Sequence, residues 1–222
     1  MTVLDDIPFR LDEAAFLRLT RLESTAEVRG LLERVAAAAR PKAAYKVCYV
    51  GARGADRVRI EGQEFRSEVL ARNLEEVERV FPYVATCGTE LEELEELEQP
   101  TADLFARYCL DVLKELALAA GRDRLLEHLR TAHGATRLSS MNPGSGDARL
   151  WPLGQQRPLF GLLGDVEGAI GVRLTSSLLM RPNKSVSGIL FPSEVHFESC
   201  QLCTREDCPR RRTPFGGASA HP

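Results

Sequence analysis

The chain has 222 residues, of which 44% are hydrophobic, and this is enough to fill the core of one domain. Its 29 Lys and Arg residues are offset by 32 Asp and Glu residues, so the net charge of -3 argues against a broad basic surface for nucleic acid or an anionic membrane. No segment approaches the roughly 20 apolar residues of a membrane span, and the first ten residues do not resemble a secretory signal. We therefore expect a cytoplasmic protein with no nucleic-acid or membrane partner.

The first third of the chain predicts one helix and one hairpin. Residues 25–40 have apolar side chains at helical spacing, with Ser24 or Thr25 as a cap and Pro41 as a breaker. The segment AYKVCYV is β-branched and aromatic, and GARG separates it from the alternating VRI of residues 58–60. This arrangement is typical of two antiparallel strands joined by a turn.

Three helices are predicted in the middle of the chain. The acidic run LEELEEL follows a capping box formed by Thr89 and Glu92, and its charged face is expected to be solvated. From Thr101 an apolar face continues over several turns and predicts a helix that ends near Gly121. The stretch RDRLLEHLRTAH predicts a further helix, whose two histidines are expected to face solvent.

The last third predicts a short helix and a second hairpin. The helix is expected around residues 155–166, and the strand-like runs VRLTSSLLM and SVSGILF are joined by RPNK. Together the elements predict an α+β fold, a single domain with a twisted, mainly antiparallel sheet flanked by helices. We place this domain at residues 1–212 and expect residues 213–222 to form a disordered tail.

Residues 175–191 contain a strand ending in Met-x-Pro that turns into Ser-Val-Ser-Gly. Proline fixes φ at the bend, glycine permits the close approach of another surface, and small hydroxyl residues can meet a flat ligand rimmed by amides. From the pattern alone, the same residues also fit a tight hairpin without a ligand. The segment resembles the signature of the activation domain of cobalamin-dependent methionine synthase. The matching residues, which the resemblance implies are cofactor-binding, are Met180, Pro182, Ser185, Val186, Ser187 and Gly188.

A second motif of the family lies upstream, where RLSSMNPGS precedes a helix containing QQRPLFGLLGDVEGAIGVRLT. In the family, an Arg-x-Ser/Ala-Pro-Gly-Tyr motif at this place binds S-adenosylmethionine. Arg137 and Ser139 match its first and third positions, whereas Ser140, Met141 and Asn142 replace the Pro, Gly and Tyr. The resemblance implies that Arg137 pairs with the carboxylate of S-adenosylmethionine, since a guanidinium suits a carboxylate. An ordinary surface arginine is the alternative interpretation.

The resemblance covers residues 135–200 best, and ATCGTELEE and GQEFRSEVLARNL are similar to segments of the short, free-standing members of the family. It implies a C-shaped domain that meets a cobalamin-binding domain when the cobalt has been oxidised. One electron and a methyl group from S-adenosylmethionine then restore methylcobalamin. The implied partner is a corrinoid-binding protein, or a methionine synthase lacking its own activation domain, which carries the cobalamin.

The cysteines are crowded near the end of the chain, where Cys200, Cys203 and Cys208 are spaced as C-x2-C-x4-C. In a reducing compartment, three thiolates at this spacing suit one metal centre. An iron–sulfur cluster, a structural zinc, and cysteines that are unliganded or disulfide-bonded all remain open. The candidates for a fourth ligand are His196, Cys48, Cys87 and Cys109.

The basic string at residues 210–212, next to the cysteines, fits either the docking of an acidic electron carrier or a charged tail without a role. The chain has no nucleophile elbow, phosphate loop or Rossmann glycine pattern, which argues against independent catalysis. The leading hypothesis is therefore an accessory reactivation component of a corrinoid methyltransferase. The alternative is a metal-binding docking or scaffold protein for a corrinoid domain, without redox or methyl chemistry.

Overall fold

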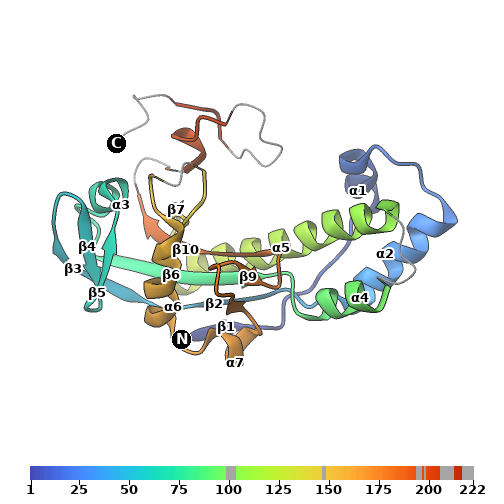
Figure 1. The fold of residues 1–222 in the computed structure, drawn as a ribbon, viewed down its shortest axis with the longest axis horizontal. Helices are drawn as coiled ribbons and strands as arrows, with labels where there is room; N and C mark the ends of the chain where they lie inside the picture. Colours follow the sequence, from blue (N-terminus) through green and yellow to red (C-terminus); the bar gives the residue numbers. More distant parts are fainter. Residues whose placement is uncertain (99–103, 147–148, 194–196, 198, 206–212, 217–222) are drawn as a thin grey trace.

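The computed structural model describes residues 1–222 except 99–103, 147–148, 194–196, 198, 206–212 and 217–222. It is a mixed α+β fold built on a twisted antiparallel sheet, as the sequence predicts (Figure 1). The strands are β1 (Thr2–Leu4), β2 (Lys42–Tyr45), β3 (Cys48–Arg53), β4 (Arg57–Ile60), β5 (Gln63–Arg66), β6 (Arg79–Thr86), β7 (Leu138–Met141), β8 (Arg173–Leu174), β9 (Met180–Arg181) and β10 (Ser185–Pro192).

The helices lie at one end of the molecule and along both faces of the sheet (Figure 1). They are α1 (Glu13–Thr20), α2 (Ala26–Ala38), α3 (Glu68–Asn73), α4 (Glu90–Glu98), α5 (Leu104–His133), α6 (Gln156–Leu163) and α7 (Val166–Ile170), with short 3-10 turns η1 (Leu153–Gln155) and η2 (Ser199–Gln201). The predicted cap of α2 is confirmed, because the Thr25 hydroxyl accepts a hydrogen bond from the Val28 N–H at 3.2 Å. No helix in the described part of the chain is long and apolar enough to cross a bilayer.

Strand β6 is the centre of the main sheet. It pairs with β10 along residues 81–86, while β2 pairs with residues 83–86 and β3 with residues 79–80. Because β2 and β10 pair with the same stretch of β6, they lie on its opposite edges. All but the first residue of β6 are buried, as expected for a strand covered on both faces.

The hairpin predicted around GARG is confirmed, since β3 pairs with β4. The second predicted hairpin is wrong, because β10 pairs with β6 and β7. Residues 175–179 instead form a tight turn, in which the Thr175 N–H donates to the Leu179 carbonyl at 2.8 Å and Leu178 has a φ of 66°. This turn leaves only the two-residue strands β8 and β9 to pair with each other.

Helix α5 is continuous through Gly121, so the predicted end near that residue is wrong. Gly121 is buried, and a Cβ there would lie 3.4 Å from the Thr86 carbonyl oxygen and 3.5 Å from the Lys42 carbonyl oxygen. The glycine therefore marks a close approach between the helix and two strands. Local sequence cannot distinguish this role from a helix end, because the strands that require it lie elsewhere in the chain.

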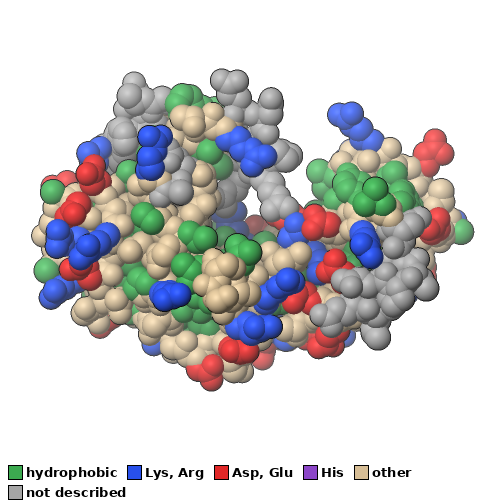
Figure 2. Space-filling view, viewed as in Figure 1, with side chains coloured by type: hydrophobic (Ala, Val, Ile, Leu, Met, Phe, Trp, Pro, Cys, Tyr) green, Lys and Arg blue, Asp and Glu red, His purple; other side chains and the backbone are tan. Residues whose placement is uncertain are grey.

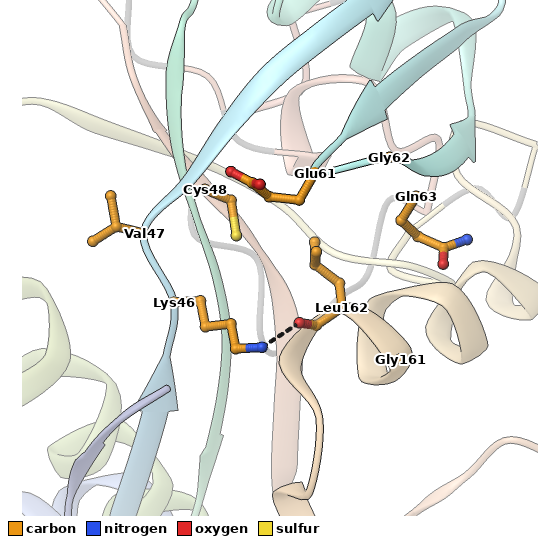
Figure 3. A pocket seen from close by; sticks show the side chains of 8 residues that line it. All are labelled: Lys46, Val47, Cys48, Glu61, Gly62, Gln63, Gly161 and Leu162. Carbon is orange, nitrogen blue, oxygen red and sulfur yellow. Dashed lines mark hydrogen bonds between the residues drawn. The ribbon is translucent and has the colours of Figure 1, made fainter.

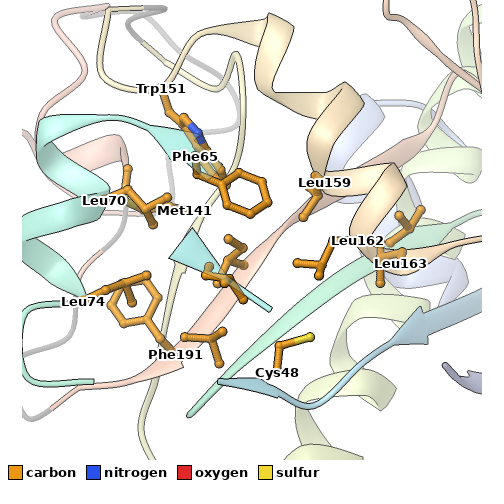
Figure 4. Close-up of a cluster of buried hydrophobic side chains, with 14 of the residues drawn as sticks. Cys48, Phe65, Leu70, Leu74, Met141, Trp151, Leu159, Leu162, Leu163 and Phe191 are labelled. Carbon is orange, nitrogen blue, oxygen red and sulfur yellow. The ribbon is translucent and has the colours of Figure 1, made fainter. Parts of the chain in front are cut away.

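Among the described residues, the buried apolar side chains form three clusters. One packs between the sheet and helices α3, α6 and α7, where Trp151 is 1% exposed and meets Phe65 edge to face (Figure 4). A second holds α1, α2 and α4 against the first half of α5. The third packs the second half of α5 on the other face of the sheet. Helix α5 thus joins the helical end of the molecule to the sheet.

The end of α5 is fixed to β2 by two histidines, which were expected to face solvent. The Tyr45 hydroxyl lies 2.9 Å from Nε2 of His128 and 2.9 Å from Nε2 of His133. Tyr45 is buried, and both histidines are partly buried. The expectation is wrong because the hydroxyl that pairs with them is supplied by a strand more than 80 residues away.

Candidate ligand groove

A groove of about 1080 Å³ lies between the sheet and the helical end of the molecule. We call residues 142–146 its loop wall and residues 178–187 its strand wall. Helix α5, Leu153, Gln156 and residues 200–205 also line it. Figure 2 shows one face of the molecule, which is notched beside the helical end and carries acidic and basic side chains interspersed. The volume suits a ligand of nucleoside size or larger.

Some of the residues on which the resemblance rests are brought together here. Those that line the groove are Met180, Ser185, Val186 and Ser187. Cys200 and Cys203 of the separate cysteine segment line it as well. Pro182 and Gly188 belong to the same segment but are not lining residues. The Ser187 hydroxyl is buried and has no hydrogen-bond partner among the described residues, and the same is true of the Gln156 side-chain oxygen. A buried hydroxyl in this state needs an explanation, and a bound ligand is one.

Arg137 and Ser139 do not line the groove. Arg137 is exposed. Ser139 is fully buried, and its hydroxyl accepts a hydrogen bond from the Phe197 N–H at 2.7 Å. The structure thus places these two residues of the upstream motif outside the groove, although β7 pairs with β10 and Ser139 lies opposite Phe191 of the downstream segment.

The sequence reasoning missed the loop wall and the part of α5 that faces it. Gly144 and Gly146, at φ of 72° and 74°, give the loop its turns, and the Gly144 N–H donates to the Trp151 carbonyl at 2.8 Å. The signal was the Pro-Gly pair followed by Ser-Gly, which marks a tight turn. For Glu115 and Arg122 of α5 there was no signal, because they look like ordinary polar positions of a helix.

The loop wall is joined to the sheet by the side-chain amide of Asn142, which is 5% exposed. Its Nδ2 donates to the Tyr83 hydroxyl and to the Ser187 carbonyl, both at 2.8 Å. Its Oδ1 accepts from the Ser140 hydroxyl at 3.0 Å. All of these groups are neutral and lie in the interior, where a satisfied network is rigid.

Gly188 was expected to let another surface approach, and the surface that approaches it is internal. A Cβ on Gly188 would collide with the Asn142 amide nitrogen and the Met141 carbonyl oxygen. The glycine therefore makes room for the loop that follows β7. We assign it a packing role between β10 and this loop.

The part of the strand wall that precedes β10 is held by charges. Lys184 Nζ lies 2.8 Å from an oxygen of Asp111 and 3.7 Å from one of Glu115, both on α5. Arg181 lies 3.5 Å from the Glu92 carboxylate of α4, which also accepts the Asn183 N–H at 2.7 Å. The side chains of Lys184 and Arg181 are 10% and 56% exposed, so these ion pairs range from nearly buried to solvated.

Three arginines line the groove, namely Arg122, Arg181 and Arg205. Arg122 is partly buried, and its Nε is shielded from solvent. A guanidinium in such a place can hold a carboxylate with two parallel hydrogen bonds.

The predicted metal centre is only partly within the described residues, because Cys208 and His196 lie outside them. Cys200 and Cys203 sit in a turn in which the Cys203 N–H donates to the Cys200 carbonyl at 3.3 Å. Among the described residues, no three His, Cys, Asp or Glu side chains converge as a metal site. Burial raises the pKa of Cys48 to about 11 and that of Cys87 to about 12, which favours packed thiols over metal ligands. Cys109 is fully buried too.

A smaller, open cavity of about 690 Å³ lies beside β3 and α6 (Figure 3). Its one cation, Lys46, donates to the Leu162 carbonyl at 2.8 Å and so satisfies a carbonyl at the end of α6. The Glu61 carboxylate adds to burial in raising the pKa of the Cys48 thiol on its wall. This cavity therefore holds neither an available cation nor a reactive thiolate.

No family model and no curated protein matches the chain. Among solved structures, it is similar to the crystal structure of the MetH reactivation domain bound to AdoHcy. The alignment covers 83% of this chain and 68% of that chain, with a TM-score of 0.61 and 16% identity. Likeness at this identity establishes the architecture. The chain therefore has the activation-domain-like fold that the sequence resemblance implies.

Proposed function

We propose that this chain is a reactivation component of a cobalamin-dependent methionine synthase or a related corrinoid methyltransferase. The observation that carries the proposal is the groove. In a chain with the fold of a reactivation domain, it is lined by residues of the strand wall on which the family resemblance rests. We propose that the cobalamin belongs to the partner, which is a separate corrinoid-binding protein or a methionine synthase lacking its own activation domain. Both proteins are proposed to act in the cytoplasm.

The groove is proposed to bind S-adenosylmethionine, the methyl donor of reactivation. The neighbouring structure holds AdoHcy, which is the demethylated form of the same compound. The buried Ser187 hydroxyl would gain a hydrogen-bond partner from such a ligand. Because Arg137 lies outside the groove, Arg122 is the better candidate to hold the amino-acid carboxylate.

The mouth of the groove suits the corrin face of a partner. Leu179 is 60% exposed, and Ser185 and Val186, which also line the groove, are small and partly buried. Apolar and small hydroxyl side chains can meet a flat ring without clashing and can still reach its amide rim. The partner's cobalt would thereby be brought towards the methyl donor.

The electron that reactivation needs is proposed to arrive through the cysteine segment, with an iron–sulfur cluster as the first choice and zinc as the alternative. The support is the turn between Cys200 and Cys203, which places two thiols on the groove wall. Cys208 and the basic residues 210–212, proposed to dock an electron carrier, lie outside the described residues. Metal analysis of anaerobically prepared protein separates the two metals, and zinc without iron would remove the redox role.

Calorimetric titration with AdoHcy and with S-adenosylmethionine tests the ligand site. We expect binding to wild-type protein, at least about tenfold weaker binding to Arg122→Met, and a similar loss for Ser187→Ala. Arg137→Met tests the position that the resemblance implies, and it should bind as wild type does. If neither ligand produces heat on titration, the methyl-donor role is ruled out. If only Arg137→Met loses affinity, Arg137 holds the carboxylate, as the resemblance implies.

Co-purification with the corrinoid protein, followed by absorption spectra of the cobalt state, tests the partner. We expect binding of the oxidised corrinoid protein and a return of methylcobalamin when S-adenosylmethionine and a reductant are supplied. Binding without any change in the cobalt spectrum would favour the docking or scaffold alternative. Absence of binding would overturn the proposal.

A further inference from the structure

We infer that Asn142 is a positioning residue, which sets the spacing between the two walls of the groove without contacting the ligand through its side chain. The effect on ligand binding rests on the proposed function, whereas the role of Asn142 in spacing the walls does not. Asn142 begins the loop wall and is 5% exposed, and its amide lies in the interior of the sheet. In the sequence, Asn142 stands out only as a departure from the upstream motif.

The amide joins three neighbouring strands. Tyr83 belongs to β6, Ser187 to β10, and Ser140 to β7, and each of these residues is at most 2% exposed. With Nδ2 towards Tyr83 and the Ser187 carbonyl, and Oδ1 towards the Ser140 hydroxyl, each atom of the amide has a suitable partner. The flipped orientation would set Oδ1 against the Ser187 carbonyl oxygen, so the hydrogen bonds fix the orientation.

The same residue controls both walls because its backbone shapes the loop and its side chain holds the strand. The Asn142 carbonyl accepts the Ser145 N–H at 3.1 Å, which closes the turn of the loop wall. Its side chain holds the carbonyl of Ser187, the residue at the inner end of the strand wall. Movement of the amide would therefore change the distance between the walls.

Gly188 is the structural complement of this amide. The amide occupies the space next to Gly188, where a Cβ would collide with it. A side chain as large as asparagine fits at position 142 because the facing residue has none. Gly188, the last residue of the Ser-Val-Ser-Gly segment, thus makes room for Asn142 of the loop wall.

The test compares Asn142→Ala and Asn142→Asp with Asn73→Ala, a matched control. The Asn73 amide contacts the sulfur of Met141 at 3.3 Å, one residue from Asn142, but does not line the groove. Asn142→Asp keeps an acceptor for Ser140 and loses both donated hydrogen bonds, so it should behave no better than the alanine variant. Hydrogen exchange of the ligand-free proteins and titration with AdoHcy are the two measurements.

In both Asn142 variants we expect amide exchange about tenfold faster or more in residues 143–146 and 185–188, with little change in the helical end of the molecule. AdoHcy affinity should fall by at least about tenfold, whereas Asn73→Ala should retain it. Unchanged exchange in both walls of Asn142→Ala would refute the inference, as would wild-type AdoHcy affinity in that variant. If wild-type protein binds no AdoHcy but the walls loosen as expected, the methyl-donor proposal fails and the positioning role stands.

Discussion

The two walls of the groove are held in place by different physical means. The loop wall depends on one neutral amide and partners in the core, which are at most 2% exposed. The strand wall depends on Lys184 and Arg181, whose ion pairs reach α5 and α4. The loop wall is therefore tied to the sheet. The strand wall is tied to the sheet by residues 185–187, which pair with β6, and to the helical end of the molecule by Arg181 and Lys184.

This difference predicts how each wall responds to its surroundings. A neutral buried network depends on geometry, and a missing partner leaves polar groups unsatisfied in the interior. Ion pairs near the surface are weaker, and salt screens them. The Debye length, beyond which charges are screened from each other, is about 10 Å at 0.1 M salt and about 3 Å at 1 M. The loop wall should thus act as the fixed side of the groove, and residues 178–184 of the strand wall, which precede β10, as the side that adapts to a ligand or partner.

The largest effect is expected from Gly188→Leu, which places a side chain against the loop wall. Collision with the Asn142 amide and the Met141 carbonyl should destabilise the protein by at least about 4 kcal/mol, or prevent folding. Urea unfolding followed by circular dichroism measures this. Gly161→Leu is the matched control, because nothing lies within 4 Å of a Cβ at this helical position. Its stability should be unchanged or raised by up to about 1 kcal/mol, and equal stability of both variants would contradict the assigned role of Gly188.

A smaller effect is expected from Lys184→Met, which removes the ion pairs with Asp111 and Glu115. The carboxylates remain partly exposed and can be hydrated, so the loss should be about 1 to 2 kcal/mol at 0.1 M salt. The difference between this variant and wild type should shrink at 1 M salt. Urea unfolding at the two salt concentrations checks this.

The exposed pair of Arg57 with Asp56 provides the control for that measurement. Arg57→Met should leave the stability unchanged at either salt concentration, because both side chains are at least half exposed. A salt-independent loss in Lys184→Met would show that the strand wall is held by packing of the lysine stem. The proposed contrast between the walls would then be lost.

The amino-acid sequence predicts the parts of this molecule that depend on local pattern. The cap at Thr25 and the hairpin around GARG are examples, since neighbouring residues contain all the information. It does not predict that β10 pairs with β6, because the apolar strand SVSGILF fits a neighbouring partner equally well. Nor does it predict that α5 continues through Gly121, since the strands that require the glycine are distant in sequence.

The same distinction applies to the groove. The strand wall was found because its residues are consecutive and carry a recognisable pattern. Arg122 was missed because a single arginine on a helix carries no local signal. Asn142 was named only as a mismatch to a motif, and its partners Tyr83 and Ser187 lie 59 and 45 residues away. Hydrogen bonds of such separation cannot be inferred from one sequence.

The smallest expected effect is the loss of stability on acidification. It should arise at the end of α5 and leave both walls of the groove unchanged. Neither wall contains a histidine, so a histidine response between pH 7 and 5 must arise elsewhere. Burial, then the charge of Arg79 and the proximity of His128, lower the pKa of His133 from its ordinary value of 6.5. The unfolded chain therefore binds this proton more readily than the folded protein does, and stability falls as the pH drops below about 6.5 towards the lowered pKa.

Replacing His133 with Gln should remove that part of the pH dependence, although it also changes the contact with Tyr45. The relevant quantity is therefore the change in unfolding free energy between pH 7 and 5, compared between variant and wild type. We expect a difference well under about 1 kcal/mol, because His133 is only partly buried and solvent screens its charge. Hydrogen exchange in residues 143–146, corrected for the intrinsic effect of pH, should be the same in both proteins. A pH response of the loop wall that disappears in His133→Gln would show that the end of α5 and the groove are coupled, and that the fixed wall is less independent than its neutral hydrogen bonds imply.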